Sequence, residues 1–361
     1  MSDELYDKLA KVLDTLPNGF PASETGVEIK LLKRIFEPDQ AELFCDLKLT
    51  FETAEQIAER TGRPLKGLEE MLTAMWERGQ LFGIKFGDTK VFKMVPWVFG
   101  IYEFQLPHMD RELAEMCEEY GKVYGLQFFQ KKPQFMQVIP IEREIQAKHE
   151  ALTYERVSSI VENGQAFLLN ECICKKEQGL LENPCDKPLE VCLAIAPVPN
   201  VFDDAKIGRP ISKEEAYKVL NQSEEEGLVH LTWNVKGGHS FICNCCGCCC
   251  GVLHGINKWN IPASKVVNSY YFATIDPDEC AACGTCADER CQVNAVEERE
   301  DAYEVVKERC IGCGLCVTTC PSEAIKLIRK EPEELVPPPM DEMAWYEERA
   351  LERGVDFSAY K

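Results

Sequence analysis

The sequence lacks any run of apolar residues that approaches the roughly 20 needed to cross a bilayer. Its first residues, Met1 to Leu5, contain neither the basic nor the apolar segment of a secretory signal. Positive charge is also scarce, with 40 Lys and Arg against 61 Asp and Glu, a formal net charge of −21. Nucleic-acid binders cluster Lys and Arg on one surface, which this balance disfavours. We therefore expect a cytoplasmic protein with no membrane span and no nucleic-acid partner.

Cysteine is almost absent from the first 171 residues, where only Cys45 and Cys117 occur, although the chain of 361 residues contains 20. The other cysteines fall in four groups after that point. A disulfide framework is not expected in a chain of this length without a secretory signal. Dense cysteine in such a chain indicates metal binding or redox chemistry. Glycine fingerprints for nicotinamide, a P-loop and a nucleophile elbow are all missing, so those enzyme classes have no support.

Residues 1–105 are expected to form a first, mostly helical domain. Apolar spacing predicts helices over residues 28–36, 40–47 and 64–78, and Thr53 with Gln56 suggests a capping box that starts another. Apolar and polar residues alternate on both sides of Gly87-Asp88, which predicts a β-hairpin. This layout over residues 25–96 resembles a winged helix. The same residues hold 11 basic and 12 acidic side chains, so we interpret the region as a docking or dimerisation module rather than a DNA reader.

The rest of the chain divides by its cysteine content into three segments. Residues 106–273, which contain ten cysteines from Cys172 to Cys250, are expected to form a central cysteine-rich iron–sulfur domain with a helical insert that opens with a capping box from Ser212 to Glu215. Residues 274–330, with the motifs Cys280-x2-Cys283-x2-Cys286-x4-Cys291 and Cys310-x2-Cys313-x2-Cys316-x3-Cys320-Pro321, are expected to form a dicluster ferredoxin domain. Residues 331–361, which contain Pro337-Pro338-Pro339, are expected to form an extended C-terminal tail that lies on the protein or on a partner. The predicted fold class is α+β.

Two cysteine repeats define the ferredoxin segment. The first has the spacing C-x2-C-x2-C-x4-C and the second C-x2-C-x2-C-x3-C-P, in which the fourth cysteine serves the other cluster. A tight loop can wrap three corners of a [4Fe–4S] cubane, whereas the fourth corner points away from it. Cluster I is therefore assigned to Cys280, Cys283, Cys286 and Cys320, and cluster II to Cys291, Cys310, Cys313 and Cys316.

This segment resembles the two-[4Fe–4S] ferredoxin domain, and Gly284, Gly312 and Gly314 suit loops whose backbone approaches sulfide. The first repeat departs from that family in two ways. It has one extra residue before Cys291, and Gln292 stands where proline is usual. We expect the two clusters to be inequivalent for this reason.

A second cysteine field lies upstream and supplies ten further metal ligands: Cys172, Cys174, Cys185, Cys192, Cys243, Cys245, Cys246, Cys248, Cys249 and Cys250. Cys243, Cys246 and Cys249 are again spaced by three, so one loop can wrap three corners of a cubane. The field is expected to hold one or two further [4Fe–4S] clusters. A non-cubane cluster, as in the cysteine-rich domains of heterodisulfide-reductase type, is the alternative. The nearby His230, His239 and His254 are interpreted as structural rather than ligating.

The whole chain resembles bacterial and archaeal 4Fe–4S-binding proteins that carry an N-terminal winged-helix region and a C-terminal dicluster ferredoxin domain. The resemblance implies electron transfer in an anaerobe. We expect an electron-transfer subunit of an oxidoreductase rather than a stand-alone enzyme, with a redox protein such as a flavoprotein as partner and with oligomers possible. A redox-sensing DNA-binding regulator and a reductase with an open-site central cluster remain as alternatives.

Overall fold

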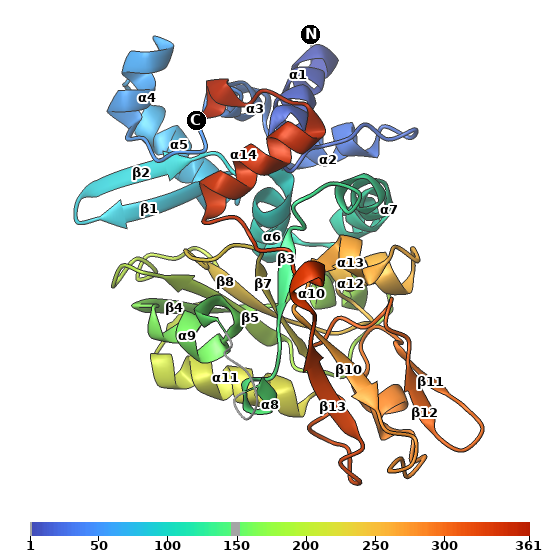
Figure 1. The fold of residues 1–361 in the computed structure, drawn as a ribbon. Coiled ribbons are helices and arrows are strands. Elements are labelled where there is room, and N and C mark those ends of the chain that lie inside the picture. Colours follow the sequence, from blue (N-terminus) through green and yellow to red (C-terminus); the bar gives the residue numbers. More distant parts are fainter. Residues whose placement is uncertain (1, 146–151) are drawn as a thin grey trace.

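The computed structural model describes residues 2–145 and 152–361 and shows a mixed α+β protein (Figure 1). A helical region at the N-terminus lies above a seven-stranded sheet in Figure 1, and the C-terminal third extends beside the sheet at the lower right as β10 (Tyr271–Ile275), β11 (Val296–Glu298), β12 (Tyr303–Val305) and β13 (Ile325–Arg329). Within the described residues, no helix is both long enough and apolar enough to span a membrane.

The N-terminal region contains the helices and the hairpin that the sequence predicts. Its elements are α1 (Ser2–Thr15), α2 (Val27–Ile35), α3 (Pro38–Phe44), α4 (Ala54–Thr61), α5 (Leu68–Glu77), β1 (Phe82–Phe86) and β2 (Thr89–Lys93). The capping box at the start of α4 forms, because the Thr53 hydroxyl accepts from the Gln56 amide and the Gln56 side chain accepts from the Thr53 amide. The strands β1 and β2 pair antiparallel around Gly87-Asp88. The assignment of these elements to a winged helix stays a prediction.

One long helix joins the N-terminal region to the centre. Three short elements, η1 (Trp97–Ile101), α6 (Tyr102–Phe104) and η2 (Leu106–His108), lead into α7 (Arg111–Phe128). Asp110 caps α7 by accepting from the Leu113 amide. The helix packs against α2 on one side and against helices of the central region on the other. One hydrophobic cluster accordingly runs from Tyr6 to Phe357, and the N-terminal and central regions share a core.

The central sheet has the strand order β6-β4-β5-β8-β7-β3-β9 and is antiparallel except for the β3–β9 pair. Its strands are β3 (Met136–Ile139), β4 (Ala166–Glu171), β5 (Glu190–Ala196), β6 (Arg209–Ile211), β7 (Val229–Trp233), β8 (Phe241–Cys245) and β9 (Val267–Asn268). The helical elements among them are α8 (Glu142–Ile145), η3 (Thr153–Glu155), α9 (Val157–Glu162), α10 (Ile173–Leu180), α11 (Lys213–Glu225), α12 (Gly251–Asn257) and α13 (Ala263–Val266). The predicted insert helix is α11, and the Ser212 hydroxyl caps it by accepting from the Glu215 amide.

The ferredoxin segment is carried on a two-stranded stem. The strands β10 (Tyr271–Ile275) and β13 (Ile325–Arg329) pair antiparallel, and the cysteine loops between them include η4 (Cys286–Arg290), β11 (Val296–Glu298) and β12 (Tyr303–Val305). Arg329 anchors this stem to the central region through two hydrogen bonds to the fully buried carboxylate of Glu155, at 2.6 and 2.8 Å. The stem therefore fixes both ends of the segment at one place on the protein.

The C-terminal segment is only partly extended. After η5 (Pro332–Glu334) the chain runs without regular structure to Asp341, and then forms α14 (Glu342–Arg353) and η6 (Ser358–Tyr360). Asp341 caps α14 by accepting from the Ala344 amide, which is why a helix forms here rather than an extended tail. Trp345 and Arg349 are fully buried against the protein, and the Arg349 guanidinium donates to the carbonyl oxygens of Phe128, Lys131 and Pro133.

Candidate metal centres

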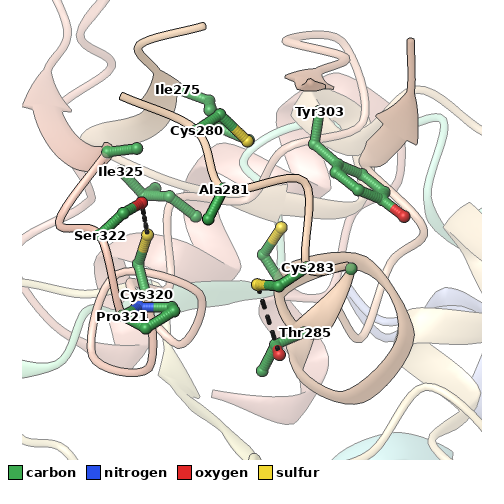
Figure 2. Close-up of a pocket in the computed structure, with 13 residues that line it drawn as sticks. Ile275, Cys280, Ala281, Cys283, Thr285, Tyr303, Cys320, Pro321, Ser322 and Ile325 are labelled. Atoms are coloured by element: carbon green, nitrogen blue, oxygen red, sulfur yellow. Dashed lines mark hydrogen bonds between the residues drawn. The ribbon is translucent and has the colours of Figure 1, made fainter. Parts of the chain in front are cut away.

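The four cysteines assigned to cluster I surround one cavity. Cys280, Cys283, Cys286 and Cys320 line a space of about 320 Å³, together with Ile275, Tyr303 and Pro321 (Figure 2). Figure 2 shows that Cys320 reaches this space from a separate loop, beyond the first repeat. Its thiol lies 3.7 Å from the Ser322 hydroxyl, and the Cys283 thiol lies 3.7 Å from the Thr285 hydroxyl. The structure thus brings together three residues of one repeat and the last cysteine of the other.

The four cysteines assigned to cluster II surround a second cavity. Cys291, Cys310, Cys313 and Cys316 line about 370 Å³, with Ala273, Ala295 and Val305 among the apolar residues around them. Two backbone amides donate to these sulfurs: Ala295 to Cys291 at 3.1 Å and Ala273 to Cys310 at 3.4 Å. Such donors stabilise thiolates, and they tune the potential of a cluster that the thiolates hold. The donor set and the apolar lining fit a [4Fe–4S] cluster in each cavity, and the ligand assignments remain predictions.

The two ferredoxin cavities differ in their exposure to solvent. Cys283 in the first cavity is exposed, whereas all four cysteines of the second are buried or half-buried. Burial raises the pKa of the Cys313 thiol to about 12 and that of Cys286 to about 11. Gly284, Gly312 and Gly314 have φ values of 79°, 63° and 81°, the left-handed region that glycine adopts without strain. The loops therefore have the glycine conformations that the sequence predicts. The exposed Cys283 makes the first cavity the one nearer to solvent.

The ten cysteines of the central field separate into a group of six and a group of four. The six, in which each thiol shifts the pKa of its neighbours, are called the thiol ring and are Cys172, Cys174, Cys192, Cys243, Cys245 and Cys250. The four, which we call the tetrad, are Cys185, Cys246, Cys248 and Cys249. The simple sequence grouping by chain position does not predict this division, because both groups take residues from both cysteine segments.

The sheet explains how the thiol ring forms. Cys243 and Cys245 are two apart on β8 and therefore lie on the same face, while Cys246 beyond the strand end belongs to the tetrad. Cys192 comes from β5, which pairs with β8. Cys172 and Cys250 are the residues immediately before α10 and α12, and Cys174 lies in the first turn of α10. Four separate elements thus contribute to one ring.

The four tetrad thiols lie close to one another. The Sγ atoms of Cys185 and Cys246 are 3.7 Å apart, those of Cys185 and Cys248 are 3.5 Å apart, and those of Cys248 and Cys249 are 3.6 Å apart. Within residues 2–145 and 152–361, this is the one group of three or more Cys, His, Asp or Glu side chains whose ligand atoms all lie within 4.8 Å of one another. The tetrad can hold a metal ion.

The charge of one buried lysine acts on a thiol of the ring and on a thiol of the tetrad. Lys175 is 4% exposed and donates from Nζ to the Pro188 carbonyl at 2.5 Å. Hydrogen bonds from Cys172 and Cys243 lower the pKa of Cys192 to about 5, and the charge of Lys175 adds to this effect. A hydrogen bond from Cys249 lowers the pKa of Cys246 to about 5, again with help from Lys175. Each group therefore contains one thiol that ionises readily, which suits it to bind metal.

Two carboxyl groups lie beside Cys174 on the side of the N-terminal region. The carboxyl of Glu177 accepts a hydrogen bond from the Tyr102 hydroxyl, and that of Glu103 accepts from the Gly100 amide at 2.7 Å. Burial raises the pKa of both carboxyls to about 8. They accordingly hold protons at neutral pH, next to a ring in which thiolates would carry negative charge.

The three histidines near the central field have hydrogen-bond partners in the protein. Nδ1 of His230 lies 2.5 Å from the Asn244 side-chain oxygen, and Nδ1 of His239 lies 3.3 Å from the Thr232 hydroxyl. Nε2 of His254 lies 3.0 Å from the Cys248 carbonyl oxygen, so this ring supports the backbone of the tetrad. These contacts are consistent with the interpretation of the three histidines as structural rather than metal-ligating residues.

Sequence reasoning noted Gln292 only as a missing proline, and it missed Lys175 altogether. The Gln292 side chain accepts from the Gly247 amide at 2.8 Å, and its backbone carbonyl accepts from the Asn257 side chain at 2.9 Å. Gly247 lies between two tetrad cysteines, and Gln292 follows Cys291. The departure from the ferredoxin pattern was therefore a usable signal, since proline has no side-chain acceptor. A lone lysine such as Lys175 gave no signal.

One family model matches part of the chain. A 4Fe–4S binding domain (Fer4) matches residues 303–326, which contain the second ferredoxin repeat. No curated protein and no solved structure matches the chain. The match supports an iron–sulfur protein and covers neither the central field nor the N-terminal region.

Proposed function

We propose that the protein is an electron-transfer protein or subunit of an oxidoreductase that relays electrons between its central cysteine field and a redox partner. In this proposal, the first ferredoxin cavity takes cluster I and the second takes cluster II, with the ligands assigned above. The thiol ring takes one further iron–sulfur cluster. When bound, these clusters supply one-electron carriers. The observation that carries the proposal is the contact between Gln292 and Gly247.

This contact joins the two cysteine regions directly. Gln292 adjoins Cys291 of the second cavity, and Gly247 adjoins Cys246 and Cys248 of the loop that also carries the ring thiol Cys250. The backbones are so close that a Cβ built on Gly247 would lie 2.2 Å from the Gln292 carbonyl oxygen. Only glycine fits here. A relay requires a short path, and this hydrogen-bonded junction joins the loop that carries the ring thiol Cys250 to the segment that carries Cys291.

Exposure favours the first cavity as the point where electrons leave or enter. Cys283 is exposed, and its surroundings are acidic, with Asp276, Asp278, Glu279, Asp288 and Glu289 all exposed in the same stretch of chain. Opposite charge on a partner accelerates encounter. We therefore propose a redox partner with a basic surface, which docks over Cys283.

The N-terminal region is proposed to be a docking module, and nothing in its contacts favours the regulator hypothesis. Two ion pairs join it to the 204–206 loop of the central region: Lys85 to Asp204 at 3.6 Å and Lys206 to Glu77 at 3.2 Å. The Lys206 ammonium also lies over the Trp76 ring, 5.4 Å from its centroid. The helix that would enter a DNA groove, α5, thus already contacts this loop.

The relay is tested by substituting Gln292 in the holo protein. Gln292→Leu keeps the size of the side chain and removes the acceptor, whereas the control Gln292→Glu keeps an oxygen that accepts from Gly247. Freeze-quench EPR after rapid reduction should show slower equilibration between the central and ferredoxin signals in the Leu variant only. Equal equilibration in both variants, or a total of eight or fewer irons per chain where three cubanes need about twelve, would contradict the proposal.

A further inference from the structure

The spacing of the tetrad sulfurs separates this site from the cluster sites. Four ligands around a single tetrahedral ion with metal–sulfur bonds of about 2.3 Å lie about 3.8 Å apart, the edge of the tetrahedron. Three sulfur pairs of the tetrad are 3.5, 3.6 and 3.7 Å apart in the structure, and all four sulfurs lie within 4.8 Å of one another. A cubane places four irons and four sulfides between its terminal thiolates, which must then lie much further apart. The tetrad is too tight to surround such a core.

The ferredoxin cavities provide an internal comparison for this argument. Their eight cysteines line two cavities, four in each. Among the described residues, neither of these sets, nor the thiol ring, contains three sulfurs that lie within 4.8 Å of one another, as all four of the tetrad do. The same structure therefore distinguishes open sets, which leave room for a cluster, from one closed set.

The surroundings of the tetrad support a closed structural site. Cys246 and Cys249 are 1% and 3% exposed and pack with Val191 and Leu228 in a small hydrophobic cluster. Cys185 is brought to them by the loop whose Pro188 carbonyl is held by Lys175. The backbone on either side of Cys248 is fixed, by Gln292 at Gly247 and by His254 at the Cys248 carbonyl. Outer contacts of this kind orient metal ligands.

We infer that Cys185, Cys246, Cys248 and Cys249 bind one mononuclear metal ion in a tetrahedral tetrathiolate site, zinc or a single iron, and not an iron–sulfur cluster. Four sulfur ligands in tetrahedral geometry select these ions. Because all four positions are filled by the protein, the ion is structural. It ties the loop after α10 to the segment that follows β8, and so holds the junction with Gln292 in place.

The first test is metal analysis of the anaerobically purified holo protein. One zinc per chain is expected beside about twelve irons, or about thirteen irons if iron occupies the tetrad. X-ray absorption at the zinc edge should show only sulfur at about 2.3 Å, with no metal–metal scattering. If iron occupies the site, Mössbauer spectroscopy should show one isolated tetrathiolate iron. A wild-type protein in which every metal belongs to a cluster would overturn the inference.

Two variants locate the ion. Cys248→Ser, at the exposed corner, together with Cys185→Ser should remove the mononuclear ion and leave the cluster irons in place. The matched control Cys243→Ser, from the thiol ring, should lose cluster iron and keep the mononuclear ion. Loss of about four irons in the tetrad variant would show a cubane at this site and overturn the inference. These readouts are metal counts, so they do not depend on whether the proposed relay functions.

Discussion

The ferredoxin segment and the central cysteine field both bring together cysteines that are distant in the sequence, but they do so in different ways. In the ferredoxin segment, three cysteines of each cavity come from one loop and the fourth from the partner repeat, so cysteine spacing along the chain predicts which cysteines lie together. In the central field, the ring thiols come from two helix starts and two paired strands, α10, α12, β5 and β8. The comparison teaches that cysteine spacing identifies a site only where a single loop forms most of it.

The largest difference between the two regions should appear when one thiol of each is replaced. Cys243→Ser removes a ring ligand held by the central sheet, and we expect loss of about four irons together with a clear fall in the urea midpoint. Cys283→Ser removes an exposed ligand from a surface loop, and we expect a change in one cluster with little loss of stability. Iron and sulfide analysis measures the loss of metal, and urea unfolding monitored by circular dichroism measures the loss of stability. An equal fall in the urea midpoint of the two variants would contradict the expected difference between the two regions.

The anchor of the ferredoxin stem gives a second test of how the regions are joined. Arg329→Ala leaves the fully buried Glu155 carboxylate without its cation, at a cost of about 3–5 kcal/mol. The matched control is Lys307→Ala, which breaks the exposed pair with Glu334 at 3.1 Å and should cost less than about 1 kcal/mol. Urea unfolding of the holo proteins measures the difference. Similar values for both variants would mean that the stem is not anchored through Glu155.

The remaining expected effect concerns pH and arises from two carboxyls beside the central field, Glu103 and Glu177. Burial raises the pKa of Glu103 and Glu177 from 4.5 to about 8, so the folded protein binds more protons than the unfolded chain between these values. The stability from these groups is therefore complete below about pH 4.5 and is lost as the pH rises toward 8. The urea midpoint should be higher at pH 6 than at pH 8.

Substitution identifies the groups responsible for this slope. Glu177→Gln should reduce the difference between pH 6 and pH 8, since it removes one of the two titrating carboxyls. The control Glu112→Gln changes an exposed carboxylate on the neighbouring α7 and should leave the slope unchanged. A pH profile that is the same in all three proteins would assign the effect to other groups.

Much of the secondary structure follows from local sequence signals. The capping residues Thr53 and Ser212 start their helices where expected, and the hairpin turns at Gly87-Asp88. The winged-helix assignment, the domain boundaries and the individual ligands remain predictions. The ligand sets of the two ferredoxin cavities lie together because the repeat itself encodes the wrapping of a loop.

The grouping of the central cysteines depends on which strands and loops lie together in the fold, and no local sequence pattern predicts that. The division of the central field into ring and tetrad follows from strand direction: Cys243 and Cys245 share a face of β8, and Cys246 begins the loop beyond it. Sequence spacing grouped Cys243, Cys246 and Cys249 instead. The helix α14 was likewise hidden behind a proline-rich stretch, although Asp341 and Gly354 at its two ends are ordinary start and stop signals.

The position of α14 has a consequence for the order in which the protein is made. Trp345 and Arg349 fill the space beside Phe128 and Phe135, residues that leave the ribosome more than two hundred positions earlier. Because α14 follows the central field and the ferredoxin loops in the sequence, it can pack on that core only after both have been synthesised. All eighteen cysteines of the metal regions are thus synthesised before the last piece of the core is in place.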